Sequence, residues 1–232
     1  MKTLFTGLKK ISMTAVLATS LAAGIPAISQ ATPILKYRVG SATPVSIAGT
    51  LGGLVSTPGW VITNGVSLNL AGTSKPNSGT AERPNIDLST ADVYNGTPSP
   101  IGVDVWLTDT DFASHTTPLA LLSSYSVTLG SGATAEFWSY ASESNNPFDT
   151  SPPAIQLNDS GLITAAGGFG NSYSTQTLAD PFSLTLYAHF SLKSNKQATS
   201  SDQSISVPEP SILGMVGLGL LMVGLMGLRF RQ

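Results

Sequence analysis

Two long stretches of the chain alternate hydrophobic and polar residues, and they determine the expected fold. Between residues 182 and 192, every second position holds Phe, Leu, Leu, Ala, Phe or Leu, with polar or aromatic residues between them. Residues 101–107 follow the same pattern, with Ile101, Val103, Val105 and Leu107 on one side. Because successive side chains of a strand point to opposite faces, each stretch predicts a β-strand with one buried face.

Turn residues divide most of the remaining chain into further short strands. Asn64-Gly65 separates residues 60–63 from residues 66–70 and is a typical two-residue hairpin turn. Strands are also expected at 45–51, 125–129, 134–140 and 155–163. The glycine-rich residues 167–170 lack the lysine and the strand-to-helix context of a phosphate-binding loop, and are interpreted as a loop. Roughly seven to ten short strands predict a mostly β protein, an antiparallel β-sandwich of Ig-like or jelly-roll-like type.

The two ends of the chain carry a different pattern. Residues 1–31 combine three lysines with an apolar stretch and a cleavage site after Ala31, which predicts a helical N-terminal signal peptide. Residues 212–228 are uncharged, would form roughly 26 Å of helix, and predict a C-terminal transmembrane helix. Residues 32–193 are the expected exported domain, and the Ser-, Thr- and Gln-rich residues 194–206 are an expected flexible linker.

A short motif surrounds the expected transmembrane helix. In order, it comprises Val207, Pro208, Glu209, Pro210, the apolar run, and the basic stop residues Arg229 and Arg231. This arrangement over residues 207–232 resembles the PEP-CTERM sorting signal of Gram-negative bacteria that produce extracellular polysaccharide. The resemblance implies that an exosortase, a membrane-embedded transpeptidase-like protease, recognises and removes the tail. An uncleaved single-span anchor is the alternative interpretation.

The exported part is also similar to uncharacterised β-rich PEP-CTERM proteins. The similarity is carried by short stretches at residues 49–51, 60–63, 85–89, 106–112 and 180–186. It spans most of the exported domain and implies an exported β-sandwich without an assigned activity.

Charge and cysteine content narrow the range of functions. Residues 32–207 contain six Lys and Arg against twelve Asp and Glu, so the exported part has a formal charge of −6. An acidic domain without a basic cluster is a poor binder of nucleic acid and of anionic lipid. The chain contains no cysteine, which excludes disulfides, thiol catalysis and Cys-ligated zinc.

Few residues indicate chemistry, and no cofactor is expected. His115 and His189 are interpreted as surface residues, since no Gly-x-Ser-x-Gly nucleophile motif accompanies them. Asp109 and Asp111 at a strand end are a candidate Ca²⁺ site, although hydrogen bonds to their own turn explain them more simply. Trp106 falls opposite the apolar alternation, and an outward tryptophan is a candidate platform for a sugar ring.

The sequence therefore predicts an exported, exosortase-processed surface or extracellular-matrix protein with a structural or adhesive role in the polysaccharide envelope or biofilm, and no enzymatic activity. One alternative is a carbohydrate-binding module with Trp106 as its platform. The other is a secreted carbohydrate-active enzyme using paired acids among Asp92, Asp104, Asp109 and Asp111.

The expected partners follow from this route. They are the secretion machinery and signal peptidase, the exosortase, the membrane before processing, and extracellular polysaccharide, but no nucleic acid. After export through the inner membrane and transient anchoring, the protein is expected at the cell surface or in the extracellular matrix.

Overall fold

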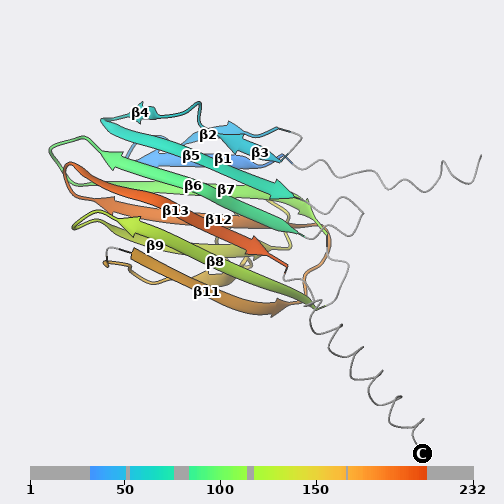
Figure 1. Cartoon of the computed structure of the whole chain (residues 1–232). Helices are drawn as coiled ribbons and strands as arrows, with labels where there is room; N and C mark the ends of the chain where they lie inside the picture. Colours follow the sequence, from blue (N-terminus) through green and yellow to red (C-terminus); the bar gives the residue numbers. More distant parts are fainter. Residues whose placement is uncertain (1–31, 51–52, 76–83, 114–117, 166, 208–232) are drawn as a thin grey trace, which may run out of the picture.

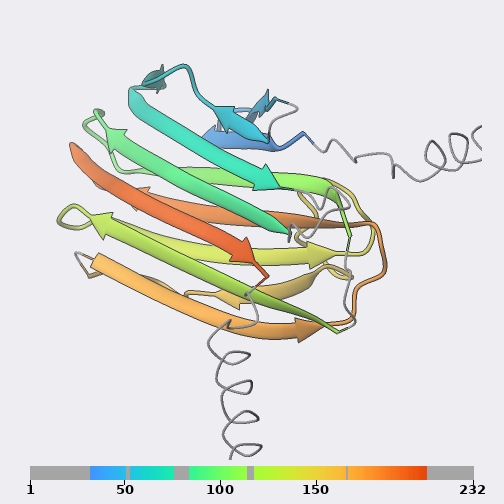
Figure 2. The same ribbon diagram turned by 45° about the vertical axis from the view of Figure 1, so that its right-hand side comes forward.

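The computed structural model describes residues 32–50, 53–75, 84–113, 118–165 and 167–207, where every helix or strand assigned is a β-strand. The strands form two antiparallel sheets that face each other (Figures 1 and 2), which confirms the predicted sandwich. Within these ranges no helix is long and apolar enough to cross a membrane. The predicted signal peptide, residues 208–210 of the motif and the helix at 212–228 lie outside the described residues.

Sheet A has six strands, and sheet B has seven. In spatial order, sheet A contains β10 (Ile155–Asp159), β9 (Thr134–Ser142), β12 (Phe182–Leu192), β7 (Ile101–Phe112), β1 (Ile34–Val39) and β2 (Val45–Ala48). Sheet B contains β11 (Gly167–Gln176), β8 (Leu119–Leu129), β13 (Lys196–Ser206), β6 (Asn85–Asn95), β5 (Val66–Lys75) and β3 (Leu54–Ser56), with β4 (Val61–Thr63) also paired to β5.

The last eight strands pair as a long hairpin that has been rolled up. From the outside of the hairpin inward, β6 pairs with β13, β7 with β12, β8 with β11 and β9 with β10. Successive pairs fall in alternate sheets, which is the jelly-roll arrangement. Of the two predicted sandwich types, the described strands therefore have the jelly-roll-like one, extended at one side by β1–β5.

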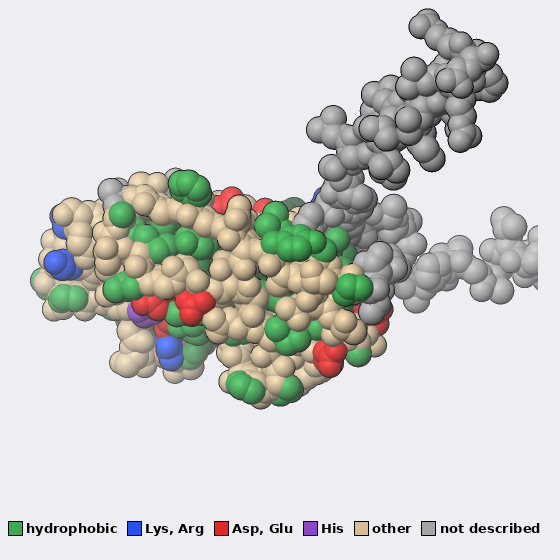
Figure 3. Space-filling model, turned by 90° about the horizontal axis from the view of Figure 1, so that it is seen from below, with side chains coloured by type: hydrophobic (Ala, Val, Ile, Leu, Met, Phe, Trp, Pro, Cys, Tyr) green, Lys and Arg blue, Asp and Glu red, His purple; other side chains and the backbone are tan. Residues whose placement is uncertain are grey.

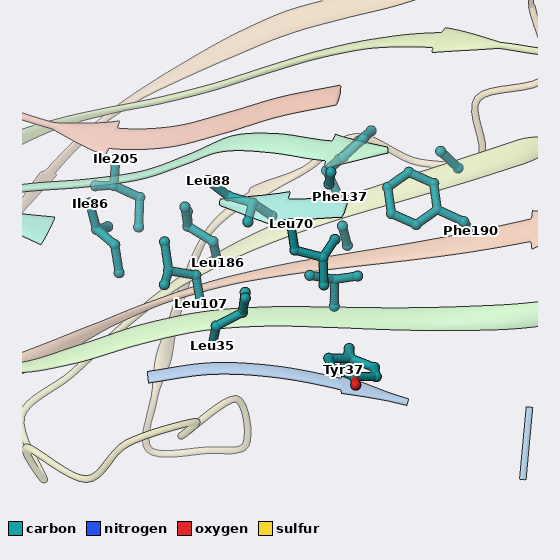
Figure 4. Close-up of a cluster of buried hydrophobic side chains, with 14 of the residues drawn as sticks. Leu35, Tyr37, Leu70, Ile86, Leu88, Leu107, Phe137, Leu186, Phe190 and Ile205 are labelled. Atoms are coloured by element: carbon teal, nitrogen blue, oxygen red, sulfur yellow. The ribbon is translucent and has the colours of Figure 1, made fainter. Parts of the chain in front are cut away.

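The space between the sheets is filled by the buried halves of the alternating strands. Leu35, Leu107 and Leu186 come from sheet A, and Leu70, Leu88 and Ile205 come from sheet B, each at most 1 % exposed. Figure 4 shows these side chains together in one cluster, with the rings of Phe137 and Phe190. The alternation of hydrophobic and polar residues along the sequence therefore places one face of each long strand in a common core.

The predicted linker is wrong. Residues 196–206 form strand β13, which lies between β6 and β8 and pairs with both. On its inner face Ser201, Gln203 and Ile205 are buried, so only one of these three side chains is hydrophobic. Backbone pairing on both sides stabilises a strand that hydrophobic patterning does not reveal.

The predicted loop at residues 167–170 is also wrong, because these residues begin the edge strand β11. A Cβ atom added at Gly168 would lie 2.8 Å from the Ile163 side chain, and one at Gly170 would lie 2.5 Å from the Tyr125 hydroxyl. Glycine at these two positions lets the strand approach its neighbours closely. The glycines therefore belong to tight packing rather than to a loop.

We expect the Ile205→Ala substitution to lower the free energy of unfolding by about 2–5 kcal/mol, because Ile205 is fully buried between the sheets. Urea unfolding followed by tryptophan fluorescence measures this. The matched control is Ser204→Ala, which removes only a hydroxyl bonded to Ser124 on the outer face and costs about 1 kcal/mol. Equal and negligible effects of both changes would restore the linker interpretation.

Candidate functional site

A row of large side chains crosses the outer face of sheet A. Its members come from four neighbouring strands and stand directly opposite one another in the strand register: Lys36, Trp106, Tyr187 and Trp138. We call these four residues the aromatic row. Each lies at a position whose chain neighbours point into the core, so the alternation that builds the sandwich also places the row outside.

The three rings of the aromatic row are stacked. The ring centroids of Trp106 and Tyr187 lie 4.9 Å apart with an interplanar angle of 4°, and those of Trp138 and Tyr187 lie 4.9 Å apart at 20°. Nearly parallel rings at this distance overlap face to face with an offset. Tyr187 therefore has a tryptophan against each of its faces.

The stack ends differently on its two sides. The Lys36 ammonium lies 4.6 Å from the centroid of the Trp106 ring, and Lys36 comes from the side of β7 opposite to Tyr187. Both faces of Trp106 are therefore engaged. Among the described residues no second ring and no cation is stacked on Trp138. The structure thus places the predicted platform residue Trp106 inside the stack, and Trp138 at its open end.

A second row of charged and polar side chains runs beside the rings. It consists of Arg38, Asp104, His189 and Glu136, again in direct register across the same four strands. We call it the charged row. Arg38 Nη2 donates to Asp104 Oδ2 at 2.6 Å, and the Tyr187 hydroxyl donates to Asp104 Oδ1 at 2.8 Å. His189 Nδ1 lies 2.8 Å from the same Oδ1 atom, so Asp104 joins the two rows.

The contacts of Asp104 determine the protonation of the cluster. Burial alone would raise the pKa of Asp104, but the hydrogen bonds from His189, Tyr187 and Arg38 outweigh it and hold the pKa at about 2. The hydrogen bond to Asp104 in turn raises the pKa of His189 above its ordinary value. Burial and the Asp104 hydrogen bond raise the pKa of the Tyr187 hydroxyl. Asp104 is thus a fixed carboxylate.

The segment between β9 and β10 borders the aromatic row on one side. The Phe148 amide donates to the Thr108 hydroxyl at 3.2 Å, and the Phe148 ring lies 3.7 Å from the Lys36 ammonium. Asn145 exchanges two hydrogen bonds with Asp111, one through its amide oxygen and one through its amide nitrogen, both at 2.8 Å. Phe148 thus covers Thr108, which is buried although it lies on the outward side of β7, and the Thr108 hydroxyl lies 2.9 Å from that of the buried Thr185.

The other predicted acids are separated in space. Asp92 lies on β6 in sheet B and accepts a hydrogen bond from Asn69 there, whereas Asp104 lies on the outer face of sheet A. Asp109 is buried, and its Oδ1 accepts from the Thr110 amide at 2.8 Å. Burial raises the pKa of Asp109 to about 6.

The candidate calcium pair, Asp109 and Asp111, is engaged with its own surroundings. Asp109 bonds its adjacent backbone, and both Asp111 oxygens accept from neighbouring side chains, Asn145 and Thr110. In the described ranges no three His, Asp or Glu side chains gather as a metal site. Ca²⁺ binding at this pair stays a prediction. His115 lies outside the described residues.

The sequence predicts the outward position of Trp106 but not its partners. Tyr187 and His189 fall on the polar side of the β12 alternation, so their outward direction is visible in the sequence. The stack and the charged row depend on the register between strands that are distant along the chain, such as β7 and β12. That register is not encoded in any local motif.

No protein-family model and no curated protein matches this sequence. Among solved structures, the chain is similar to TmCBM61 in complex with beta-1,4-galactotriose (4 % identity, TM-score 0.34, covering 67 % of this chain and 87 % of that one). It is also similar to the CBM22-1 xylan-binding domain of Paenibacillus barcinonensis Xyn10C (16 % identity, TM-score 0.30, covering 66 % and 88 %). At these TM-scores the similarity does not bear on ligand or activity.

We expect the pairing of His189 with Asp104 to make stability depend on pH. Because the pKa of His189 is raised in the folded state, its contribution is complete below about 6.5 and is lost as the pH rises through the folded-state pKa. The effect is about 1 kcal/mol or less, since His189 is 36 % exposed and solvent screens the pair. Urea unfolding at pH 5.5 and 8.5 should show a larger loss in the wild type than in His189→Asn, because the raised pKa of Asp109 lowers the stability of both proteins over the same range. The same loss in both proteins would contradict it.

Proposed function

We propose that this protein is a non-enzymatic surface protein that binds extracellular polysaccharide through the outer face of sheet A. The observation that supports this function is the pairing of two rows in one register: stacked rings beside hydrogen-bonding charged groups. No described strand packs over them. The proposal joins an adhesive role with the binding of a saccharide.

The two rows match the two kinds of surface on a sugar ring. A pyranose has apolar C–H faces, which pack on aromatic rings, and hydroxyl groups, which need donors and acceptors. Trp138 is the ring at the end of the stack, and among the described residues no second ring and no cation is stacked on it. Glu136 and His189 stand next to it on β9 and β12, where a carboxylate and an imidazole can bond hydroxyl groups.

Lys36 and Arg38 hold the far end of the stack in place. Lys36 lies between the rings of Trp106 and Phe148, and Arg38 bridges to Asp104. Since Trp106, Tyr187 and Asp104 are each engaged on several sides, the rings are ordered before a ligand arrives. Preorganised rings lose little conformational entropy on binding.

Two of the four candidate acids, Asp104 and Asp92, do not suit glycoside hydrolysis. Glycoside hydrolysis requires two carboxyl groups that flank one bond, one of them protonated at working pH. The low pKa of Asp104 makes it a poor proton donor. Asp92 belongs to the other sheet and cannot act on the same sugar.

For its route to the surface, we infer export with a signal peptide and processing by an exosortase. The basis is the sequence motif Pro208-Glu209-Pro210 with the apolar run and basic end that follow it. Val207 ends the described chain directly after β13, and its amide donates to the Pro84 carbonyl at 3.3 Å. The motif would therefore be presented close to the folded domain, without the spacer that the sequence predicted.

We expect Trp138→Ala to weaken binding of the protein to its host's extracellular polysaccharide roughly tenfold, because it removes the ring at the end of the stack. Affinity electrophoresis or calorimetric titration measures the loss. Trp60→Ala is the matched control, since Trp60 is 56 % exposed and lies between β3 and β4, outside both rows. Equal losses in both variants, or no saturable binding by the wild type, would overturn the saccharide site, and release of shortened glycans would favour an enzyme.

We expect the protein recovered from the envelope of its native cells to lack residues 1–31 and about the last 25 residues. Intact-mass measurement decides this, because each removal changes the mass by more than 2 kDa, taking roughly 110 Da per residue. Recovery of a protein that retains its final residues would favour the uncleaved anchor instead.

A further inference from the structure

Strand β11 forms an unusually regular edge of the sandwich. It has ten residues, pairs with β8 over its whole length without a register shift, and contains no charged residue and no proline. It is the first strand in the order of sheet B, and no described strand pairs with its other side. A long regular edge exposes backbone donors and acceptors that can pair with another chain.

The other sheet edges are protected in the ways that natural proteins use. β2, β3 and β4 have only three or four residues each. β10 has five residues, carries Asp159 and has a register shift against β9. Short length, charge and irregularity all hinder edge-to-edge pairing. Among the described edge strands, only β11 has none of these three features.

Two aromatic side chains project from the outer side of β11. Phe169 is 89 % exposed and Tyr173 is 64 % exposed, and they lie on the same face because four residues separate them. Figure 3 views the molecule from the side that carries β11 at the lower edge of Figure 1. The surface in that view is mostly uncharged, with hydrophobic side chains in patches and charged side chains in a few separate places.

The positions of these residues are self-complementary. If two copies of β11 pair antiparallel about a two-fold axis at Asn171, Phe169 of each copy stands opposite Tyr173 of the other. Aromatic pairs at directly opposite positions stabilise antiparallel strands. Gly167 then faces Thr175, and no like charges meet anywhere along the strand. A charged partner strand would find no complementary group on β11.

We propose that the protein associates with a second copy of itself through antiparallel pairing of β11 with β11, centred on Asn171. The strand is already held in the required extended form: Gly168 and Gly170 pack closely on Ile163 and Tyr125, and the Ser172 hydroxyl donates to the Leu157 carbonyl at 3.2 Å. Pairing joins the two copies of sheet B into one continuous sheet. A two-fold interface of this kind is closed and gives dimers.

The absence of native cysteine allows a direct test on the full chain in non-ionic detergent. In the proposed dimer the two Cα atoms of residue 171 lie roughly 4.5–5.5 Å apart, within the range of a disulfide. Asn171→Cys should therefore cross-link to a dimer under mild oxidation. The matched control is Thr175→Cys, an exposed position on the same face of the same strand. Its two copies would lie roughly 27 Å apart and should not cross-link.

Charge substitution tests the same register without a covalent bond. Asn171→Lys and Asn171→Glu should each weaken the dimer roughly tenfold in sedimentation equilibrium, because like charges meet at the axis. Mixing the two variants should restore dimers, and Ser89→Lys on β6 should leave the dimer unchanged. A monomeric wild type, equal cross-linking of both cysteine variants, or no recovery on mixing would overturn the proposal.

Discussion

The structure depends on the backbone pairing of β13 between β6 and β8. This strand closes the rolled hairpin: its pairing with β6 completes the outermost strand pair, and its pairing with β8 joins the two halves of sheet B. Gln203 extends the effect across the sandwich, since its buried amide donates to the Trp138 carbonyl at 2.7 Å. Strand β13, which has few hydrophobic residues in the sequence, thus supports the backbone of Trp138 at the end of the aromatic stack.

The sequence predicts several strands with hydrophobic inner faces, but it misses two of them, β1 and β6, as well as strands whose inner faces are polar or lack side chains. β7 and β12 carry uninterrupted apolar alternation over much of their length. β12 has its predicted limits, whereas β7 begins at the predicted Ile101 but extends beyond Leu107 to Phe112. β13 buries Ser201 and Gln203, which contribute hydrogen bonds to the Ala91 and Trp138 carbonyls rather than apolar burial. β11 turns Gly168 and Gly170 inward, where the absence of a side chain is the packing requirement. Neither buried polar side chains nor inward-facing glycines can be recognised from the pattern of hydrophobic residues in the sequence.

The sequence predicts which way the side chains of the candidate site point, but not which of them contact one another. Alternation places Trp106 outside, yet it cannot show that Tyr187 covers one of its faces and Lys36 the other. That arrangement arises from pairing between β1, β7, β12 and β9, whose members are separated by up to about 150 positions along the chain. The residue most visible in the sequence, Trp106, is therefore an inner ring of the stack, and Trp138 is the ring at its end.

The two surfaces proposed for binding occupy different parts of the molecule. The aromatic and charged rows lie on the outer face of sheet A, whereas β11 is the edge of sheet B. Pairing along a sheet edge uses backbone groups in the plane of the sheet and leaves the opposite sheet's outer face uncovered. A dimer joined through β11 therefore presents two copies of the saccharide face at once. Because polysaccharides repeat their binding epitope, two linked faces on one particle raise the avidity without any new contact to the sugar. The combination of the two proposed surfaces would suit an adhesive role better than either surface alone.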